Sequence, residues 1–292
     1  IQAVDGVSIS MRKQEVLGLV GESGCGKSTL GRMVAGILEP TKGKILYDGR
    51  TISGIKKKSR AMLQIQMIFQ DPFASLNPRM RVEDIIGEAP VYHGLTDRKN
   101  LSSYVEEMLN RVGLDSSYVN RYPHQFSGGQ RQRIGIARAL AVKPEFLVCD
   151  EAIAALDVSI QAQIINLFMD LRQELNLTYL FISHDLSVVE HISDRVAIMY
   201  LGRLVEVSPT SEIFNSPNHP YTSALLNEVP RVHLRGLDYK PISGEIPSPI
   251  NPPTGCHFHL RCPYVMKRCS QEQPRLKGIA PGRLSACHLN DQ

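Results

Sequence analysis

Nine residues near the start of the chain have the composition and spacing of a phosphate-binding loop. The sequence Gly21-Glu-Ser-Gly-Cys-Gly-Lys-Ser-Thr29 has the form G-x-x-x-x-G-K-S, between a short apolar run and a stretch with helical spacing. Glycines let a backbone wrap around a polyphosphate, and the N–H groups at a helix start attract its negative charge. Lys27 would reach the β- and γ-phosphates, and the Ser28 hydroxyl would bind Mg²⁺. We therefore expect a nucleoside triphosphate to contact Gly21, Glu22, Ser23, Gly24, Cys25, Gly26, Lys27, Ser28 and Thr29.

Two carboxylates follow a second apolar run and are candidates for metal binding and catalysis. The run Phe146-Leu-Val-Cys ends in Asp150 and Glu151. If the end of this strand lies beside the phosphate loop, Asp150 would hold the Mg²⁺ ion. Glu151 would then polarise a water molecule for in-line attack on the γ-phosphate. Taken alone, the same pattern also describes an ordinary exit from a strand into a loop.

A third candidate is the sequence Ser127-Gly-Gly-Gln130, which predicts the start of a helix. Ser and Gln three residues apart have the spacing of a capping box, in which each side chain bonds the backbone N–H of the other. The two glycines would leave this helix end accessible to an anion. The alternative is an ordinary capped helix.

The elements that would position these residues have an α/β pattern. The chain has 292 residues, of which 42% are hydrophobic, which is enough for a buried core and excludes a disordered chain. No run approaches the roughly 18 consecutive apolar residues of a membrane-spanning helix. Short apolar strands alternate with amphipathic helices, which favours a mostly parallel core sheet. We expect core strands at 15–20, 146–149 and 178–182, helices at 28–38, 98–112 and 161–175, and a small antiparallel sheet from 3–10 and 44–48.

Composition changes near residues 230–240 and indicates a domain boundary there. Residues 1–230 carry 24 Lys and Arg against 25 Asp and Glu, whereas residues 231–292 carry 9 against 4. Proline is dense between 241 and 263, and four of the six cysteines lie in the last 40 residues. We expect an α/β domain over 1–230 and a short, irregular C-terminal domain over 231–292. The positive charge of the second segment is too small to indicate nucleic acid.

Taken together, these sequences resemble the motifs of ABC-type ATPases. The loop 21–29 resembles Walker A, the pair Asp150-Glu151 resembles Walker B, and Ser127-Gly-Gly-Gln130 resembles the family's signature motif. The resemblance implies the ABC ATPase fold, with a mostly parallel core sheet, a small antiparallel β subdomain and a helical subdomain that carries the signature motif.

Further matches extend the resemblance along nearly the whole chain. Gln70 is similar to the Q-loop glutamine, His184 resembles the switch histidine, and Asp157 resembles the D-loop aspartate. Two longer stretches, 69–78 and 217–225, look like the ATP-binding subunits of bacterial dipeptide and oligopeptide importers.

The resemblance implies an ATPase that converts ATP and water to ADP and phosphate. Its catalytic residues would be Glu151, His184 and Gln70. Its Mg²⁺ ion would be held by Ser28, Gln70 and Asp150. Members of this family pair head to tail, so one subunit serves the nucleotide bound by the other. The residues that serve the neighbour's nucleotide would be Ser127, Gly128 and Gly129. Gln130 and Asp157 would also belong to the cofactor-binding set, and Asp157 lies in the loop that would cross to the partner subunit.

The resemblance also implies partners and a location. We expect a peripheral subunit on the cytoplasmic face of the bacterial inner membrane, powering import of di- or oligopeptides. It would pair with a second ABC ATPase subunit, with a heterodimer favoured, and dock on two transmembrane permease subunits. An extracytoplasmic peptide-binding protein would deliver the peptide, and no nucleic acid is expected.

Two departures from the family pattern leave alternatives open. Ala152 and Ala154 stand where the family has Pro and Ser after the acidic pair. One alternative is therefore a subunit of the same importer that binds ATP but hydrolyses it weakly. A second alternative, which does not depend on these two residues, is a soluble ABC ATPase that is not coupled to transport.

The C-terminal segment contains four cysteines that could form a metal centre, Cys256, Cys262, Cys269 and Cys287. Four thiolates can hold Zn²⁺ or an iron–sulfur cluster. The spacings lack the C-x2-C pairs of structural zinc sites, and a reducing cytosol argues against disulfides. The resemblance implies a 4Fe–4S cluster, with zinc and uncommitted thiols as alternatives. Three neighbouring histidines could replace a cysteine or lie on the surface, namely His257, His259 and His288. The isolated Cys25 and Cys149 are expected to line the core.

Overall fold

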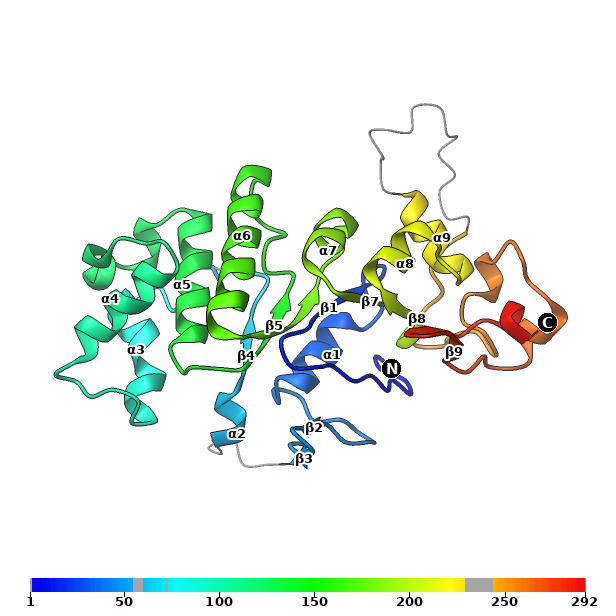
Figure 1. Cartoon of the computed structure of the whole chain (residues 1–292), viewed down its shortest axis with the longest axis horizontal. Helices are drawn as coiled ribbons and strands as arrows, with labels where there is room; N and C mark the ends of the chain where they lie inside the picture. Colours follow the sequence, from blue (N-terminus) through cyan, green and yellow to red (C-terminus); the bar gives the residue numbers. More distant parts are fainter. Residues whose placement is uncertain (1, 55–59, 72, 229–243, 292) are drawn as a thin grey trace. The chain divides into compact units, whose positions relative to one another are not determined.

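The computed structural model describes residues 2–54, 60–71, 73–228 and 244–291 (Figure 1). The expected boundary between 230 and 231 lies outside these residues, so it stays a prediction. Contacts along the chain define two compact units, which we describe separately. The first unit is made of Ile1–Met11, Glu15–Leu30 and Phe181–Gln292. The second is made of Arg12–Gln14 and Gly31–Leu180.

The first unit is built on strands that include both parallel and antiparallel pairs. Strand β1 (Val16–Val20) runs parallel to β7 (Arg195–Tyr200), which turns into the antiparallel β8 (Arg203–Pro209). The antiparallel pairing continues from β8 to β10 (Arg283–Ser285) and from β10 to β9 (Lys277–Ala280). Its helices are α7 (Leu186–Ile192), α8 (Thr210–Asn215) and α9 (Pro220–Asn227), with short 3-10 turns η3 (His259–Arg261), η4 (Lys267–Ser270) and η5 (His288–Asp291).

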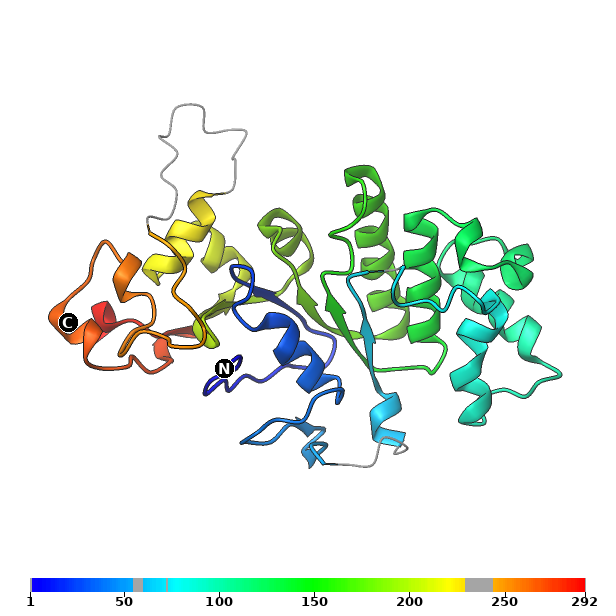
Figure 2. The same cartoon turned by 180° about the vertical axis from the view of Figure 1, so that it is seen from behind.

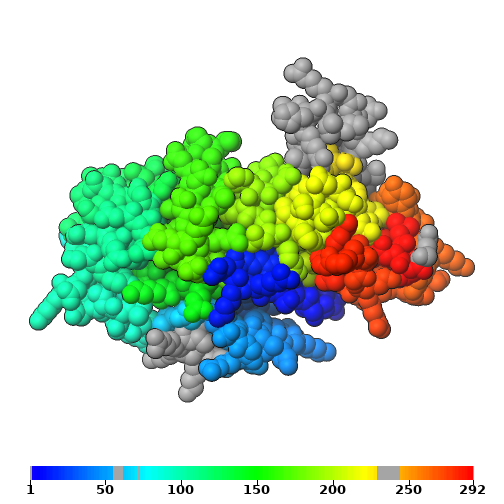
Figure 3. All heavy atoms as spheres, viewed as in Figure 1, coloured from blue at the N-terminus to red at the C-terminus, as the bar shows by residue number. Residues whose placement is uncertain are grey.

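All five residues of β1 are buried, as expected for a strand covered on both faces. Gly18 lies in its middle, and a side chain there would collide with Val189 and Ser193, so helix α7 packs against the strand at close range. The N-terminal residues, blue in Figure 3, lie beside the C-terminal residues of the same unit, which are red. Asp5 and Gly6 share a cavity of about 370 Å³ with residues 273–276.

The second unit combines a parallel strand pair with a group of helices. Strand β4 (Ile65–Ile68) runs parallel to β5 (Phe146–Asp150), and the first three residues of β6 (Thr178–Ile182) also belong to this unit. Helices α3 (Val82–Tyr92), α4 (Leu101–Arg111) and α5 (Gly128–Leu140) pack on one another, as Figure 2 shows. The other elements are α6 (Val158–Leu175), the hairpin of β2 (Leu46–Tyr47) and β3 (Arg50–Thr51), and the short α2 (Arg60–Leu63), η1 (Ser116–Asn120) and η2 (Pro123–Gln125).

Helix α1 (Lys27–Val34) begins in the first unit and ends in the second. It is shorter than the helix expected at 28–38, because the chain turns at Gly36, whose φ is +69°. The α/β class and the three core strands are confirmed, and a small antiparallel sheet is present, although only one of its two expected strands contributes to it. Among the described residues no helix combines the length and the apolar character needed to cross a bilayer.

The strand expected at 3–10 is wrong. Residues 3–10 have no regular secondary structure, and Gly6 has a positive φ of 63° that breaks an extended run. Instead, the Asp5 N–H donates to the Gly202 carbonyl at 2.8 Å, and the Asp5 carboxylate accepts from Arg203 at 2.7 Å. The segment is therefore fixed to the turn between β7 and β8. The expected strand at 44–48 shortens to β2, which pairs with β3.

Candidate nucleotide-binding site

The phosphate loop leaves the end of β1 and enters α1. Gly24 and Gly26 have φ values of 78° and 107°, which L side chains rarely adopt. A side chain on Gly26 would also collide with the carbonyl of Ala3, so this glycine is needed both for its conformation and for close approach. The loop is further fixed because the Gly202 N–H donates to the Cys25 carbonyl at 2.8 Å.

Lys27 lies within this loop rather than in solvent. Its side chain is folded back so that Nζ donates to the carbonyls of Gly21 at 2.7 Å and Glu22 at 3.0 Å, and the residue is only 5% exposed. Cys25 is also buried, and burial raises the pKa of its thiol, against the opposing charge of Lys27. A neutral thiol agrees with the expectation that Cys25 lines the core; the same holds for Cys149, whose pKa burial also raises.

The acidic pair lies at the end of β5. Asp150 is buried, and Glu151 follows with a φ of 47°, a left-handed conformation that is uncommon outside glycine. Gln70 donates from Nε2 to Oε2 of Glu151 at 2.6 Å. The second unit therefore brings together Gln70 and Glu151, two of the three residues predicted to be catalytic. The bond fixes one carboxylate oxygen of a strained residue, which is typical of a functional site.

The signature sequence forms the start of α5. Ser127 Oγ accepts from the Gln130 N–H at 3.3 Å, and Gln130 Oε1 accepts from the Ser127 N–H at 3.0 Å, so the predicted capping box is confirmed. Gly129 faces α6, where a side chain would meet Ile160 at 2.6 Å. Gly128 is less crowded, since its added Cβ would lie 3.6 Å from Leu156.

Asp157 and His184 are both exposed at helix starts. Asp157 is the N-cap residue of α6, without a side-chain bond to that helix, and the next residue, Val158, is 82% exposed. Gln161 donates to the Ile153 carbonyl at 3.1 Å and holds this turn against its helix. His184 lies between β6 and α7 in the first unit, beside Asp185, which caps α7.

The four C-terminal cysteines line one small cavity. The Cys256 N–H donates to the Cys269 carbonyl at 2.8 Å, which joins the first and third of these cysteines. Burial raises the pKa of Cys256 to about 11, and the neighbouring three thiols add to the shift. Burial also raises the pKa of Cys262 and Cys287. Within the described part of the chain, no three His, Cys, Asp or Glu side chains lie as the ligands of a single metal ion would.

Of the histidines near these cysteines, His259 and His288 line the same cavity. His257 lines the larger cavity of about 370 Å³ instead, and its Nδ1 lies 3.1 Å from the Leu201 carbonyl. The interpretation of these residues as surface histidines is wrong for His257 and His288, because both are buried.

Two contacts of the phosphate loop were not expected from the sequence. Arg261 pairs with the Glu22 carboxylate, and the Tyr221 hydroxyl accepts from the Glu22 N–H at 2.9 Å. Tyr221 lies in the stretch 217–225, which sequence reasoning used only as a family marker. Arg261 carries no comparable signal, because it is 239 residues from Glu22.

Comparisons with known proteins agree with these features. Residues 4–154 match the model of the ABC transporter family, and residues 205–269 match that of the C-terminal region of oligopeptide/dipeptide transporters. The oligopeptide transport ATP-binding protein AppF of Bacillus subtilis is 54% identical, over 99% of this chain and 90% of its own length. OppF of Salmonella typhimurium, also named as an oligopeptide transport ATP-binding protein, is 49% identical, over 95% of this chain and 85% of its own.

Solved structures support the same fold. The ATP-binding cassette MJ0796, in a dimeric post-hydrolysis state bound to ADP and Pi, matches with a TM-score of 0.65 and 25% identity, over 71% of this chain and 90% of that one. CbiO1 from Clostridium perfringens matches with a TM-score of 0.66 and 29% identity, over 73% and 84%. The chain therefore belongs to the ABC transporter family and, within it, to the oligopeptide/dipeptide transport ATP-binding proteins.

Proposed function

We propose that this chain is the ATP-hydrolysing subunit that drives an ABC importer of di- or oligopeptides. The observation that carries the proposal is the bond between Gln70 and Glu151 at the end of β5, in a chain whose phosphate loop holds Lys27 at the Gly21 carbonyl. The named activity of relatives such as AppF and OppF, oligopeptide transport, supports the peptide as cargo.

The phosphate loop would bind the β- and γ-phosphates of ATP through its N–H groups and Lys27. Ser28, Gln70 and Asp150 would hold Mg²⁺, which neutralises phosphate charge when bound. Glu151 would accept a proton from the attacking water molecule as the water oxygen bonds to the γ-phosphorus. The bond from the γ-phosphorus to the bridging oxygen then breaks and ADP leaves with that oxygen.

Gln70 would orient the Glu151 carboxylate for this transfer, since it holds one of its oxygens at 2.6 Å. His184 would contact the γ-phosphate. The exposure of Ser127 and Asp157 supports a role toward a neighbouring subunit. There Ser127, Gly128, Gly129, Gln130 and Asp157 would complete the second nucleotide site. We infer a heterodimer with a second ABC ATPase subunit, docked on two permeases at the cytoplasmic face of the inner membrane, with an extracytoplasmic peptide-binding protein.

We further propose that residues 231–292 form a separate C-terminal domain whose four cysteines hold a 4Fe–4S cluster. The shared cavity of Cys256, Cys262, Cys269 and Cys287 supports this, as do the apolar side chains of Phe258 and Met266 in its wall. A single Zn²⁺ bonded at about 2.3 Å needs thiols almost in contact. The described residues include no group of three His, Cys, Asp or Glu side chains with that spacing, so metal analysis decides between the two centres. Iron and acid-labile sulfide should copurify with the protein under anaerobic conditions, and absence of both would contradict the cluster.

The decisive experiment measures ATP hydrolysis by the reconstituted transporter, with its binding protein empty or loaded with short peptides. Loaded binding protein should stimulate hydrolysis. Glu151→Gln should lower the single-turnover rate by about 100-fold or more while ATP still binds. Glu174→Gln, an exposed carboxylate paired with Arg111, is the matched control and should leave the rate unchanged.

Each of the two alternative functions predicts a different result in this experiment. Hydrolysis indifferent to every peptide would favour an ATPase not coupled to transport. Equal slow rates in the wild type and in Glu151→Gln would favour the weakly hydrolysing subunit, for which Ala152 and Ala154 are the sequence argument.

A further inference from the structure

Glu22, the second residue of the phosphate loop, is held from three directions. Its carboxylate accepts two hydrogen bonds from Arg261, at 2.8 Å from Nη1 and 2.9 Å from Nη2. Its backbone N–H donates to the Tyr221 hydroxyl at 2.9 Å. Its backbone carbonyl accepts from Lys27 Nζ at 3.0 Å. The residue that fixes Glu22 therefore also fixes a carbonyl that holds the phosphate-binding lysine.

The ion pair of Arg261 and Glu22 is shielded from water. The Arg261 side chain is 4% exposed and that of Glu22 is 15% exposed. The two hydrogen bonds to Glu22 are the largest cause of a raised pKa at Arg261, so the guanidinium stays charged. Bidentate pairs of this kind fix geometry as well as charge, and loss of one partner leaves the other buried without its counter-ion. Lysine cannot reproduce the fork.

Arg261 belongs to residues 256–287, the segment that contains the four C-terminal cysteines and is called the cysteine segment below. It ends the short turn η3 (His259–Arg261), between Cys256 and Cys262. Its backbone N–H donates to the Phe258 carbonyl at 2.9 Å, and its guanidinium lies 5.9 Å from the ring centres of Phe258 and Tyr200. Phe258 in turn packs on Tyr200 and Tyr221, with ring centres 5.3 Å apart in both pairs. The aromatic cluster thus packs around the turn η3, and the side chain of its last residue, Arg261, reaches the phosphate loop.

We propose that Arg261 is a positioning residue of the nucleotide site. Through this residue the cysteine segment supports the conformation of the phosphate loop. Arg261 acts through Glu22 on Lys27 and on the loop backbone, so its effect is on the binding of the ATP polyphosphate. This inference rests on the proposed function, because it assumes that ATP is the ligand of the loop.

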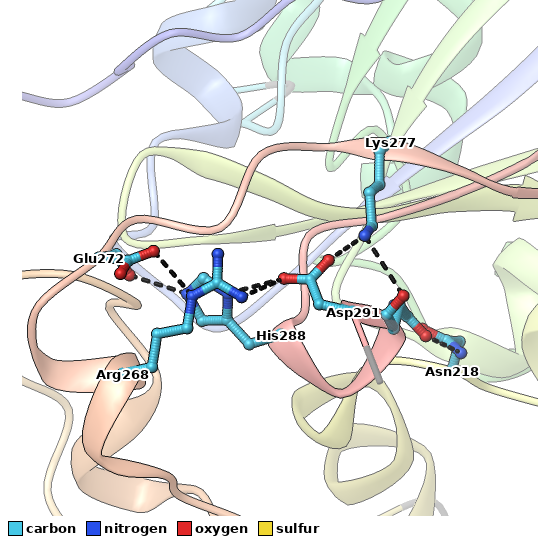
Figure 4. A network of polar contacts seen from close by, with 7 residues as sticks. Asn218, Arg268, Glu272, Lys277, His288 and Asp291 are labelled. Carbon is cyan, nitrogen blue, oxygen red and sulfur yellow. Dashed lines mark hydrogen bonds and ion pairs between the residues drawn. The ribbon is translucent and has the colours of Figure 1, made fainter.

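Other ion pairs of the C-terminal segment provide the contrast. Arg283 pairs with Glu212 at 2.8 Å, and Arg268 pairs with Glu272 and Asp291 in the network of Figure 4. The first pair holds the C-terminal residues to α8, the pairs of Arg268 lie within the C-terminal residues, and none of them includes a residue of the phosphate loop. If Arg261 served stability alone, its loss would resemble the loss of Arg283.

The test uses the assembled transporter with Arg261→Gln and the control Arg283→Gln. The measurements are KM for ATP, kcat, the dissociation constant of a fluorescent ATP analogue, and the midpoint of thermal unfolding. Arg261→Gln should raise KM and the dissociation constant about fivefold or more, in the range of ordinary coupling between sites, with kcat within about twofold. Arg283→Gln should lower the unfolding midpoint without changing either affinity.

A second set of variants separates positioning from misfolding. Glu22→Gln should reproduce the affinity loss of Arg261→Gln, and the double variant should lose no more than either single one, because both remove the same contact. The exchange variant Glu22→Arg with Arg261→Glu should recover part of the affinity. Unchanged affinity in Arg261→Gln, or equal affinity loss in Arg283→Gln, would overturn the proposal.

Failure of the proposed function has a different signature. If the wild-type complex binds the fluorescent ATP analogue but does not hydrolyse ATP, hydrolysis is refuted, and the analogue's dissociation constant still tests Arg261. If the wild-type complex binds no ATP, both proposals are refuted together.

Discussion

The phosphate loop and the signature turn (127–130) are both helix starts suited to an anion, yet the chain supports them differently. The loop is held from several sides, by the Gly202 N–H on Cys25 and by Arg261 on Glu22, and its lysine is almost fully buried. The signature turn is held by the reciprocal cap between Ser127 and Gln130, and Ser127 is exposed.

This difference fits the two roles proposed for these helix starts. A site that binds its ligand within one chain gains affinity when its groups are fixed in advance. A surface that completes a neighbour's site needs accessible N–H groups, and the helix start itself orients them. We therefore expect substitutions in the loop to act on the chain's own nucleotide, and substitutions in the turn to act mainly on catalysis in the dimer.

Replacing Lys27 with Met should give the largest effect. The variant keeps an unbranched side chain but loses the charge that would contact the β- and γ-phosphates, so hydrolysis should fall by about 100-fold or more. The steady-state rate and the dissociation constant of ATP check this in the assembled transporter.

The control is Lys13→Met, which removes an exposed lysine that pairs with Asp48. It should keep full activity. Strong ATP binding by the Lys27→Met variant would contradict the comparison, because Lys27 would then contribute little to the affinity of the loop for ATP.

Gly128→Ala tests the signature turn. The added Cβ would lie 3.6 Å from Leu156, an ordinary contact, so the fold should tolerate it, and the unfolding midpoint should stay or rise slightly. Hydrolysis should nevertheless fall about tenfold or more, because the side chain would stand between the helix start and the neighbour's phosphate. ATP affinity of the variant chain should change little.

Gly129→Ala gives the matched contrast, because its Cβ would meet Ile160 at 2.6 Å and something must shift. It should lose stability as well as activity. Full activity in Gly128→Ala would mean that the turn does not approach a nucleotide.

The parts of the molecule that were predictable from the sequence are those fixed by short-range patterns. The phosphate loop and the capping box at Ser127 each depend on residues fewer than ten apart, and β1 is a continuous apolar run. Their physical causes are local, namely backbone conformation, capping and burial of a strand.

What the sequence did not reveal depends on distant partners. Arg261 reaches Glu22 only because the chain folds back over 239 residues, and burial of His257 and His288 follows from the same folding. Residues 3–10 alternate as a strand does, but the bonds of Asp5 to Gly202 and Arg203 outweigh that local preference. Periodicity cannot show such competition.

The pH dependence of folding stability tests the contribution of His219, which lies near the loop contact Tyr221. His219 caps α9, the helix of Tyr221, and its burial lowers its pKa to about 3. The unfolded chain takes up a proton near pH 6.5, whereas the folded chain does not. Stability is therefore complete above about pH 6.5 and is lost as pH falls toward 3, at up to about 1.4 kcal/mol per pH unit.

Urea unfolding of the wild type and of His219→Asn at pH 8, 6.5 and 5 measures this loss. Asparagine keeps an acceptor for the helix cap but does not titrate. The variant should be less stable at pH 8, because packing is lost, and the gap should narrow by pH 5. A constant gap across this range would show that His219 is not the group that titrates.

Asp291 should give the smallest effect and sharpen the role of Arg261. In the network of Figure 4 it accepts from Lys277 and faces His288 and Arg268, and these groups lower its pKa to about 2, with the bond from Lys277 as the largest cause. A depressed carboxyl pKa stabilises the fold above about pH 4, and this contribution is lost as pH falls toward 2.

Asp291→Asn should therefore unfold slightly more easily than the wild type at pH 7, and the two proteins should converge near pH 2. Its affinity for ATP at pH 7 should equal that of the wild type, because the contacts of Asp291 with the described residues do not include the phosphate loop. An affinity loss as large as that of Arg261→Gln would mean that the loop responds to the whole C-terminal network. An unchanged affinity, together with the pH-dependent loss of stability, would indicate that the C-terminal residues act on the phosphate loop through the Arg261–Glu22 pair.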